Sequence, residues 1–288
     1  MSGFNIKFND KLIGKYGMDP IAFEAGSLTV RWYGIFAAGG FFAAFLLLMH
    51  RARRSAFIQK EQAADLAFFG VIGAILGSRL LYVIENWSHF QDNLFQIIRI
   101  DQGGLVFYGG FAGAAAVIIL TCRYRNHSIA NVADLFAPVI ALGHGIGRIG
   151  CFINGCCFGQ PWDGFLSVSY PYQHYSHIAG TQAQNGIIDP IVPVVPVQLI
   201  ASGGNFAICL LILLLEKFRT PAKGTLFLTY VVTYAAVRFS TEFMRGDYIT
   251  RPGGLTTAQW WCIPAVLGGA AIWVWIYYRR NPGAQQQS

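Results

Sequence analysis

The stretch GRIGCFINGCCF, residues 147–158, ends a long apolar segment with an arginine, an asparagine and three cysteines. A charged side chain at the centre of a membrane helix costs about 3 kcal/mol or more, and such residues usually face a polar cavity between helices. We therefore interpret Arg148 as a cation that binds an anionic group, such as a phosphate. The stretch predicts a membrane protein that handles lipids.

The composition of the whole chain supports a membrane protein. Of its 288 residues, 54% are hydrophobic and only 12% are charged, whereas soluble domains average roughly 25% charged residues. The mean hydropathy is +0.44. The net charge of +7 would suit nucleic acid, but the placement of basic residues around membrane spans explains it better. We expect no nucleic-acid partner.

Seven apolar segments approach the ~20 residues that a hydrocarbon core requires. They cover 28–49, 64–84, 104–122, 131–153, 197–215, 224–243 and 257–278. We predict an all-α polytopic membrane protein with seven transmembrane helices. Its parts are an N-terminal arm (1–27), helices one to four (28–154), a small head domain (155–195), helices five to seven (196–280) and a tail (281–288).

The basic residues predict the orientation of these spans. Most Lys and Arg outside the spans lie in 50–60, 123–125, 217–223 and 279–280, which fall on one side, and the long connection 155–195 has none. By the positive-inside rule this side is cytoplasmic. The N-terminus and residues 155–195 are then periplasmic, and the C-terminus is cytoplasmic.

Four arginines fall in or at the edge of spans: Arg31, Arg79, Arg148 and Arg238. Arg31 can snorkel to the interface. The others can form structural ion pairs, with Asp134 or Glu242 as partners, or can bind an anion. Guanidinium groups that converge on one cavity suit a phosphate, because the planar fork binds its oxygens in pairs.

Five motifs in order along the chain resemble the prolipoprotein diacylglyceryl transferase family. They are RWYG (31–34), GSRL (77–80), GGLVFYGG (103–110), the stretch from Gly147 to Gly159, and RFSTEFMR (238–245). The resemblance covers nearly the whole chain.

This resemblance implies an enzyme of the bacterial inner membrane, with its active site toward the periplasm. The family transfers the diacylglyceryl group of phosphatidylglycerol to the lipobox cysteine thiol that follows the signal peptide of a prolipoprotein. A thioether forms and glycerol-1-phosphate leaves. The partners would be phosphatidylglycerol, the prolipoprotein and membrane lipids, and no cofactor or metal is expected.

The chemistry needs cations at the leaving phosphate and a base for the thiol, whose free pKa is near 8.5. By analogy with the matching family positions, Arg148 and Arg238 are the expected phosphate ligands. Glu242, four residues after Arg238, is expected to orient an arginine. The other expected catalytic residues are Tyr33, Tyr108 and His144, and the other expected substrate-binding residues are Arg79, Asn154, Gly159, Tyr234 and Arg245.

The chain departs from the family pattern at several positions, and the Tyr-Glu pair that usually follows the Pro-x-Gln-Leu motif (196–199) is missing. Tyr108 stands where a histidine is usual, Cys151 where an asparagine is usual, and Cys156 where a glutamate is usual. Tyrosine, with a pKa near 10, is a poor base unless strongly perturbed. His144 lies one turn before Arg148 on the same helical face, and its unperturbed pKa near 6.5 suits a base better. The alternative is a histidine that is hydrogen-bonded between helices.

The six cysteines fall into two groups. Cys122, Cys209 and Cys262 are single residues in spans and predict inert packing. Cys151, Cys156 and Cys157 cluster at the oxidising outer face, where a disulfide, reduced structural thiols, or a redox or metal role are all open. No histidine–cysteine spacing typical of zinc accompanies them.

Outside the spans, residues 161–164 and the alternation in 165–170 suggest a short hairpin or a small head domain. Residues 180–186 predict a mobile loop, and 4–8 predict an amphipathic segment at the membrane interface. Two other functions remain open. A membrane thiol–disulfide exchanger would depend on the clustered cysteines. A non-catalytic phospholipid-binding or transport protein would bind phosphatidylglycerol without forming product.

Overall fold

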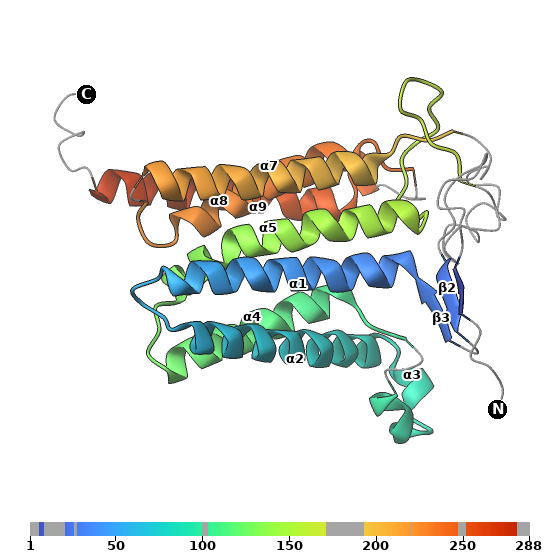
Figure 1. Cartoon of the computed structure of the whole chain (residues 1–288), viewed down its shortest axis with the longest axis horizontal. Coiled ribbons are helices and arrows are strands. Elements are labelled where there is room, and N and C mark those ends of the chain that lie inside the picture. Colours follow the sequence, from blue (N-terminus) through green and yellow to red (C-terminus); the bar gives the residue numbers. More distant parts are fainter. Residues whose placement is uncertain are drawn as a thin grey trace. The chain divides into compact units, whose positions relative to one another are not determined.

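The computed structural model describes residues 6–8, 21–25, 28–99, 103–170, 193–219, 221–246 and 252–280. Long helices dominate the chain (Figure 1), and short helices α3 (Trp87–Phe90), η1 (Leu94–Ile98) and η4 (Pro252–Gly254) lie between them. The long helices are α1 (Trp32–Arg53), α2 (Lys60–Glu85), α4 (Phe107–Tyr124), α5 (Ile129–Ile153), α7 (Val197–Phe218), α8 (Thr225–Glu242) and α9 (Thr257–Arg280).

Six of the described helices are long and apolar enough to cross a membrane: α1, α2, α4, α5, α7 and α9. The protein is therefore a mostly helical, multi-pass membrane protein, as the composition predicted. Helix α8 has 18 residues but carries Arg238, Glu242 and several hydroxyl side chains. It is not among the six, so the predicted seventh span stays a prediction.

The chain is mostly helical, as predicted, and a small sheet lies at its N-terminal side. Strands β1 (Ile6–Phe8), β2 (Ile21–Ala25) and β3 (Leu28–Arg31) form an antiparallel sheet in the order β1-β2-β3. Residues 28–31 pair with β2, so the first long helix begins at Trp32 and not at residue 28. The β-branched residues Thr29 and Val30 favour this extended backbone.

The chain divides into two compact units, residues 1–44 with 136–288 and residues 45–135. In the second unit, α2 and α4 pack closely through facing glycines, Gly73 and Gly77 on α2 and Gly109 and Gly113 on α4. A Cβ atom at any of the four would meet the backbone of the other helix at less than contact distance. This small-xxx-small pattern on both helices explains their close approach in a membrane protein.

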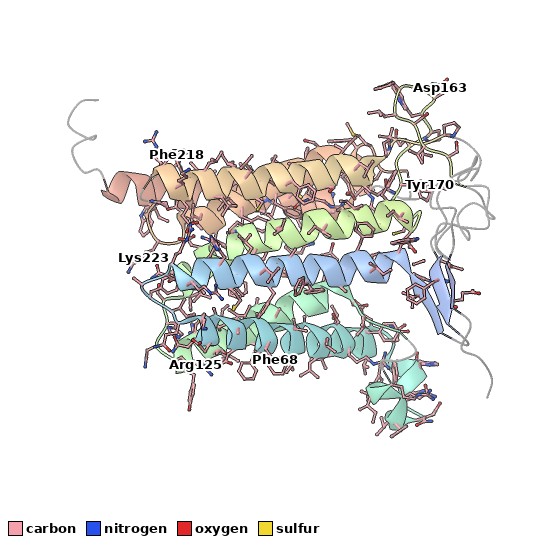
Figure 2. The ribbon with its side chains drawn as sticks, viewed as in Figure 1. Phe68, Arg125, Asp163, Tyr170, Phe218 and Lys223 are labelled. Carbon is pink, nitrogen blue, oxygen red and sulfur yellow. The ribbon has the colours of Figure 1, made fainter. Side chains whose placement is uncertain are left out.

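In the first unit, α7, α8 and α9 run alongside the C-terminal part of α5 (Figure 1). Gly145 on α5 allows close packing, because a Cβ atom there would lie 2.8 Å from the Phe206 ring of α7. The Ser202 hydroxyl donates to the Gly145 carbonyl at 2.8 Å. Lys223, after α7, lies at the opposite end of this helix layer from Asp163 and Tyr170 (Figure 2).

The segment that follows the signature stretch folds over the end of α5. Phe152, Ile153, Phe158, Tyr170 and Val194 form a buried cluster there. Val168 pairs with Val194, from which it is separated in sequence by the long connection, so the strand pairing seen here is not a local hairpin within 165–170. The loop predicted for 180–186 lies outside the described residues.

Candidate functional site

One face of α5 carries the first part of the site. His144, Arg148 and Cys151 follow each other at spacings of four and three residues, which places them along one side of the helix. The Arg148 guanidinium donates a hydrogen bond to the Tyr234 hydroxyl of α8. The His144 ring lies against Tyr234, with ring centroids 5.2 Å apart. The structure thus joins three residues that the sequence predicted for one site.

Helix α8 supplies the second cation. Arg238 Nη2 lies 2.8 Å from Glu242 Oε2, one turn further along the helix. The Glu242 side chain is fully buried and that of Arg238 is 16% exposed. Arg238 also interacts electrostatically with His144. This ion pair supports the predicted role of Glu242, which is to orient an arginine.

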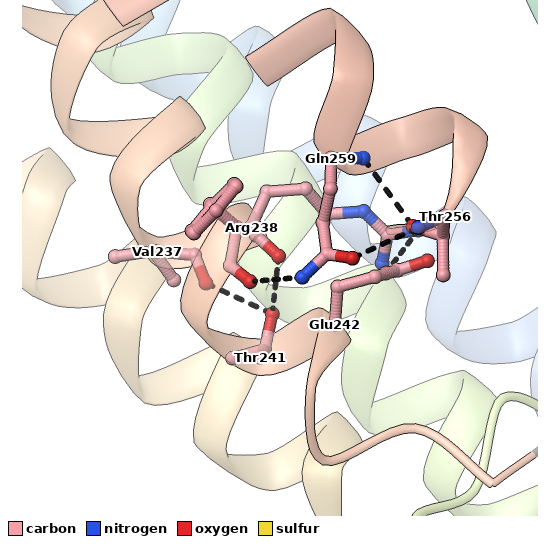
Figure 3. A network of polar contacts seen from close by, with 7 residues as sticks. Val237, Arg238, Thr241, Glu242, Thr256 and Gln259 are labelled. Carbon is pink, nitrogen blue, oxygen red and sulfur yellow. Dashed lines mark hydrogen bonds and ion pairs between the residues drawn. The ribbon is translucent and has the colours of Figure 1, made fainter. Parts of the chain in front are cut away.

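The start of α9 fixes this turn of α8 (Figure 3). The Thr256 N–H donates to Gln259 Oε1 at 2.9 Å, and the Gln259 N–H donates to Thr256 Oγ1 at 3.3 Å. Gln259 Nε2 reaches across to the Phe239 carbonyl of α8 at 3.2 Å. Neither residue was predicted for the site from the sequence, although Thr-x-x-Gln before an apolar run is a capping-box signal.

The two arginines differ in their partners. Arg238 has a carboxylate at contact distance, whereas in the described part of the chain Arg148 forms no ion pair with a carboxylate. Its neighbours are Tyr234, Cys151, Cys157 and the guanidinium group of Arg245. A half-buried cation in such surroundings is suited to bind an anionic group, because guanidinium donors that face no carboxylate keep capacity for phosphate oxygens.

The three clustered cysteines lie beside Arg148. The Sγ atoms of Cys151, Cys156 and Cys157 are all within 4.8 Å of one another, and all three residues carry free thiols. The disulfide predicted from the sequence is not confirmed by this geometry and stays a prediction. Gln198 Nε2 donates to the Cys156 carbonyl at 2.8 Å and holds the loop in place; the sequence analysis missed this buried residue.

The thiols that follow α5 influence each other's protonation. Contacts with the Cys151 and Cys157 thiols raise the pKa of Cys156 above its ordinary value, and burial acts in the same direction. Hydrogen bonds from Cys151 and Cys156 lower the pKa of Cys157. The Cys157 backbone has a φ of +60°, a region that costs a residue with a Cβ atom about 1 kcal/mol.

Other predicted site residues surround this cluster. The Tyr33 ring lies against Gly150, where a Cβ atom would be 3.5 Å from the ring, and Tyr33 interacts electrostatically with the cysteines and with Arg148. Arg245 is buried and interacts with Arg148. Asn154 is half-buried at the end of α5. The Gly159 N–H donates to the Val195 carbonyl at 3.0 Å, so its backbone is engaged within the fold.

Arg79 has a clear structural role in the other unit. Its guanidinium makes five hydrogen bonds of 2.6–3.1 Å to the carbonyls of Gln96, Ile97, Arg99, Gly103 and Gly104. Arginine has five N–H donors, so all are used. The anion-binding role predicted for Arg79 gains no support from this arrangement. Tyr108, in the first turn of α4, is 57% exposed, and its catalytic role stays a prediction.

Comparison with known proteins identifies the family. The sequence profile described as prolipoprotein diacylglyceryl transferase matches residues 20–275. The phosphatidylglycerol–prolipoprotein diacylglyceryl transferase of Bacillus velezensis is 34% identical, over 94% of this chain and 96% of its own length. The proteins of the same name from Cupriavidus necator and Clostridium tetani are 32% and 30% identical, over 92% and 88% of this chain and 95% and 96% of their own lengths. This chain therefore belongs to the prolipoprotein diacylglyceryl transferase family.

Proposed function

We propose that this chain transfers the diacylglyceryl group of phosphatidylglycerol to the lipobox cysteine of a prolipoprotein, the first step of lipoprotein maturation. The thiol loses its proton, and the sulfur attacks the glyceryl carbon that bears the phosphate. The carbon–oxygen bond breaks, and glycerol-1-phosphate leaves with the bonding electrons. Family membership supports this reaction, and the convergence of Arg148, Tyr234 and Arg238 carries the assignment of the site.

The two arginines have different tasks in this reaction. Arg148 binds the phosphate of the lipid, since it has hydrogen-bonding capacity beyond Tyr234 and faces no carboxylate among the described residues. Arg238 is held by Glu242, so its positive charge is fixed before the substrate arrives. A preorganised cation stabilises the charge that develops on the leaving oxygen without a reorganisation cost.

His144 is positioned to move a proton in this site. Its ring packs against Tyr234, and it interacts with both arginines, so it lies next to the place proposed for the phosphate. A general base must come within hydrogen-bond reach of its proton directly or through one water. His144 therefore serves the acceptor thiol or the leaving phosphate.

The membrane arrangement follows from the same proposal. Helix α8 is the seventh span, and its Arg238–Glu242 pair faces the inside of the bundle, since an ion pair is stable in a membrane only away from lipid. The positive-inside rule places the N-terminus and residues 155–195 on the periplasmic side of the inner membrane. The substrates then reach the site from that side, where the prolipoprotein emerges.

Incubation of the purified protein with phosphatidylglycerol and a lipobox peptide tests the function directly. Mass spectrometry should detect the diacylglyceryl adduct on the peptide cysteine with the wild-type chain, and no adduct with Arg148→Ala. The matched control is Arg54→Ala, because Arg54 is exposed and lies outside the site. Phosphatidylglycerol binding without adduct in the wild type would instead identify a lipid-binding protein.

A further inference from the structure

The three-cysteine cluster has the geometry of a metal site that the family activity does not require. With metal–sulfur bonds of about 2.3 Å, three thiolates around one zinc ion have sulfurs about 3.8 Å apart. The Sγ atoms of Cys151, Cys156 and Cys157 already lie within 4.8 Å of one another with no metal present. The weak Cys156 thiol contact with the Cys151 carbonyl, at 3.7 Å, is readily exchanged for a bond to a metal.

The cluster offers three ligands in the described part of the chain, and no described histidine or carboxylate joins them. Structural zinc sites are usually closed by four protein ligands, whereas catalytic sites have three and leave the fourth position to water or substrate. Three thiolates and Zn²⁺ carry a net charge of −1. The nearby guanidinium groups of Arg148 and Arg245 offset this charge and that of a further thiolate.

The position of the cluster links it to the transfer reaction. Cys151 follows Arg148 by one turn on the same face of α5, and Arg148 contacts Tyr234. A group bound at the cluster therefore lies beside the proposed phosphate site. The reaction converts a thiol into a thioether, and a thiol that coordinates zinc is deprotonated outright.

We propose that Cys151, Cys156 and Cys157 bind one Zn²⁺ ion whose fourth position takes the acceptor cysteine of the prolipoprotein as its thiolate. This inference rests on the proposed function. The acceptor S–H proton passes to solvent water, and a zinc–sulfur bond forms. That sulfur then attacks the glyceryl carbon, the carbon–oxygen bond breaks, and glycerol-1-phosphate leaves with the electron pair. The thioether product is a weaker ligand and dissociates, so the zinc ion is not consumed.

Metal analysis of the full-length protein, purified without a metal-binding tag and under reducing conditions, is the first test. We expect about one zinc per chain, lost in Cys151→Ser and Cys156→Ser. Cys157→Gly is the most informative variant, because glycine accepts the φ of +60° and removes the ligand without straining the loop. Cys209→Ala, at a buried cysteine outside the cluster, should retain the metal.

Substitution with Co²⁺ reports on the fourth ligand independently of activity. Adding the lipobox peptide should raise the sulfur-to-cobalt charge-transfer absorption by about one third, because three thiolates become four. A peptide with serine in place of the cysteine should leave the spectrum unchanged. An unchanged spectrum with both peptides would show that the metal does not bind the acceptor and would overturn the proposal.

Transfer activity then separates this inference from the proposed function. Removal of zinc by a chelator should lower transfer about 100-fold or more, the usual contribution of proton-transfer catalysis, and added Zn²⁺ should restore it. A metal-free protein, or one with a disulfide in the cluster, that transfers at the full rate would refute the zinc site and leave the transferase intact. If the protein binds zinc and its cobalt spectrum responds to the peptide, but no adduct forms, the result would support binding of the acceptor thiolate at the cluster. It would count against the proposed transferase function.

Discussion

The side chains of the buried ion pair between Arg238 and Glu242 should couple far more strongly than those of an exposed pair of similar length. Its N–O distance is 2.8 Å and the Glu242 side chain is fully buried. At an effective dielectric constant of about 20, two charges at this distance attract by about 6 kcal/mol before desolvation is subtracted. Removing one member leaves an uncompensated buried charge, which typically costs about 3–5 kcal/mol.

A double-mutant cycle with Arg238→Ala and Glu242→Ala measures the coupling between the two side chains. We expect at least about 2 kcal/mol from detergent-driven unfolding in mixed micelles, followed by circular dichroism. The chain offers a matched control, Arg125 and Asp65, whose N–O distance is 2.7 Å but whose side chains are 30% and 48% exposed. That pair should couple by about 1 kcal/mol or less. Equal coupling energies for the two pairs would refute the argument from burial.

Three further predictions follow from contacts in the structure. Arg79→Lys should lower the free energy of unfolding by about 2 kcal/mol or more, since lysine has too few donors for the five carbonyls. The affinity for phosphatidylglycerol should not change. A variant that is fully stable but has lost this affinity would show that Arg79 binds the lipid. Gly109→Ala should destabilise the protein by about 2 kcal/mol, because its Cβ atom would strike α2, whereas Gly39→Ala, with open space around it, should not. In metal-free reduced protein, iodoacetamide should label Cys157 at a lower pH than an ordinary thiol, because hydrogen bonds from Cys151 and Cys156 lower its pKa and the thiolate is the reactive form. Peptide mass mapping that finds labelling of Cys157 only above pH 8 would contradict this.

The apolar pattern predicted the long helices well, because a membrane span needs about 20 apolar residues and little else. The differences between prediction and structure concern strand pairing. Residues 28–31 were assigned to the first helix, although they pair with β2. The alternation around Val168 suggested a short hairpin or a small head domain, and Val168 pairs with the distant Val194. Strand pairing depends on the partner strand as well as on local sequence, so composition and alternation alone did not reveal it.

The site was predictable where its residues share one helix. His144, Arg148 and Cys151 follow the helical period, and Arg238 and Glu242 are one turn apart. Arg79 shows the limit of this reasoning. Its apolar surroundings in the sequence predicted an anion ligand, but the carbonyls of 96–104 occupy its donors. Every residue has a backbone carbonyl, so the pattern of side chains in a sequence does not show which carbonyls will accept hydrogen bonds from an arginine.

The sequence by itself determined that this is a multi-pass membrane protein with arginines inside its spans and the motifs of its family, because hydropathy and short motifs are local properties of the chain. Only the tertiary structure decided how those arginines are used. It commits Arg79 to backbone carbonyls and places Arg148 beside Tyr234 and the cysteine thiols. The partner of a buried charge is set by which helices pack together, and that packing depends on contacts between residues far apart in sequence.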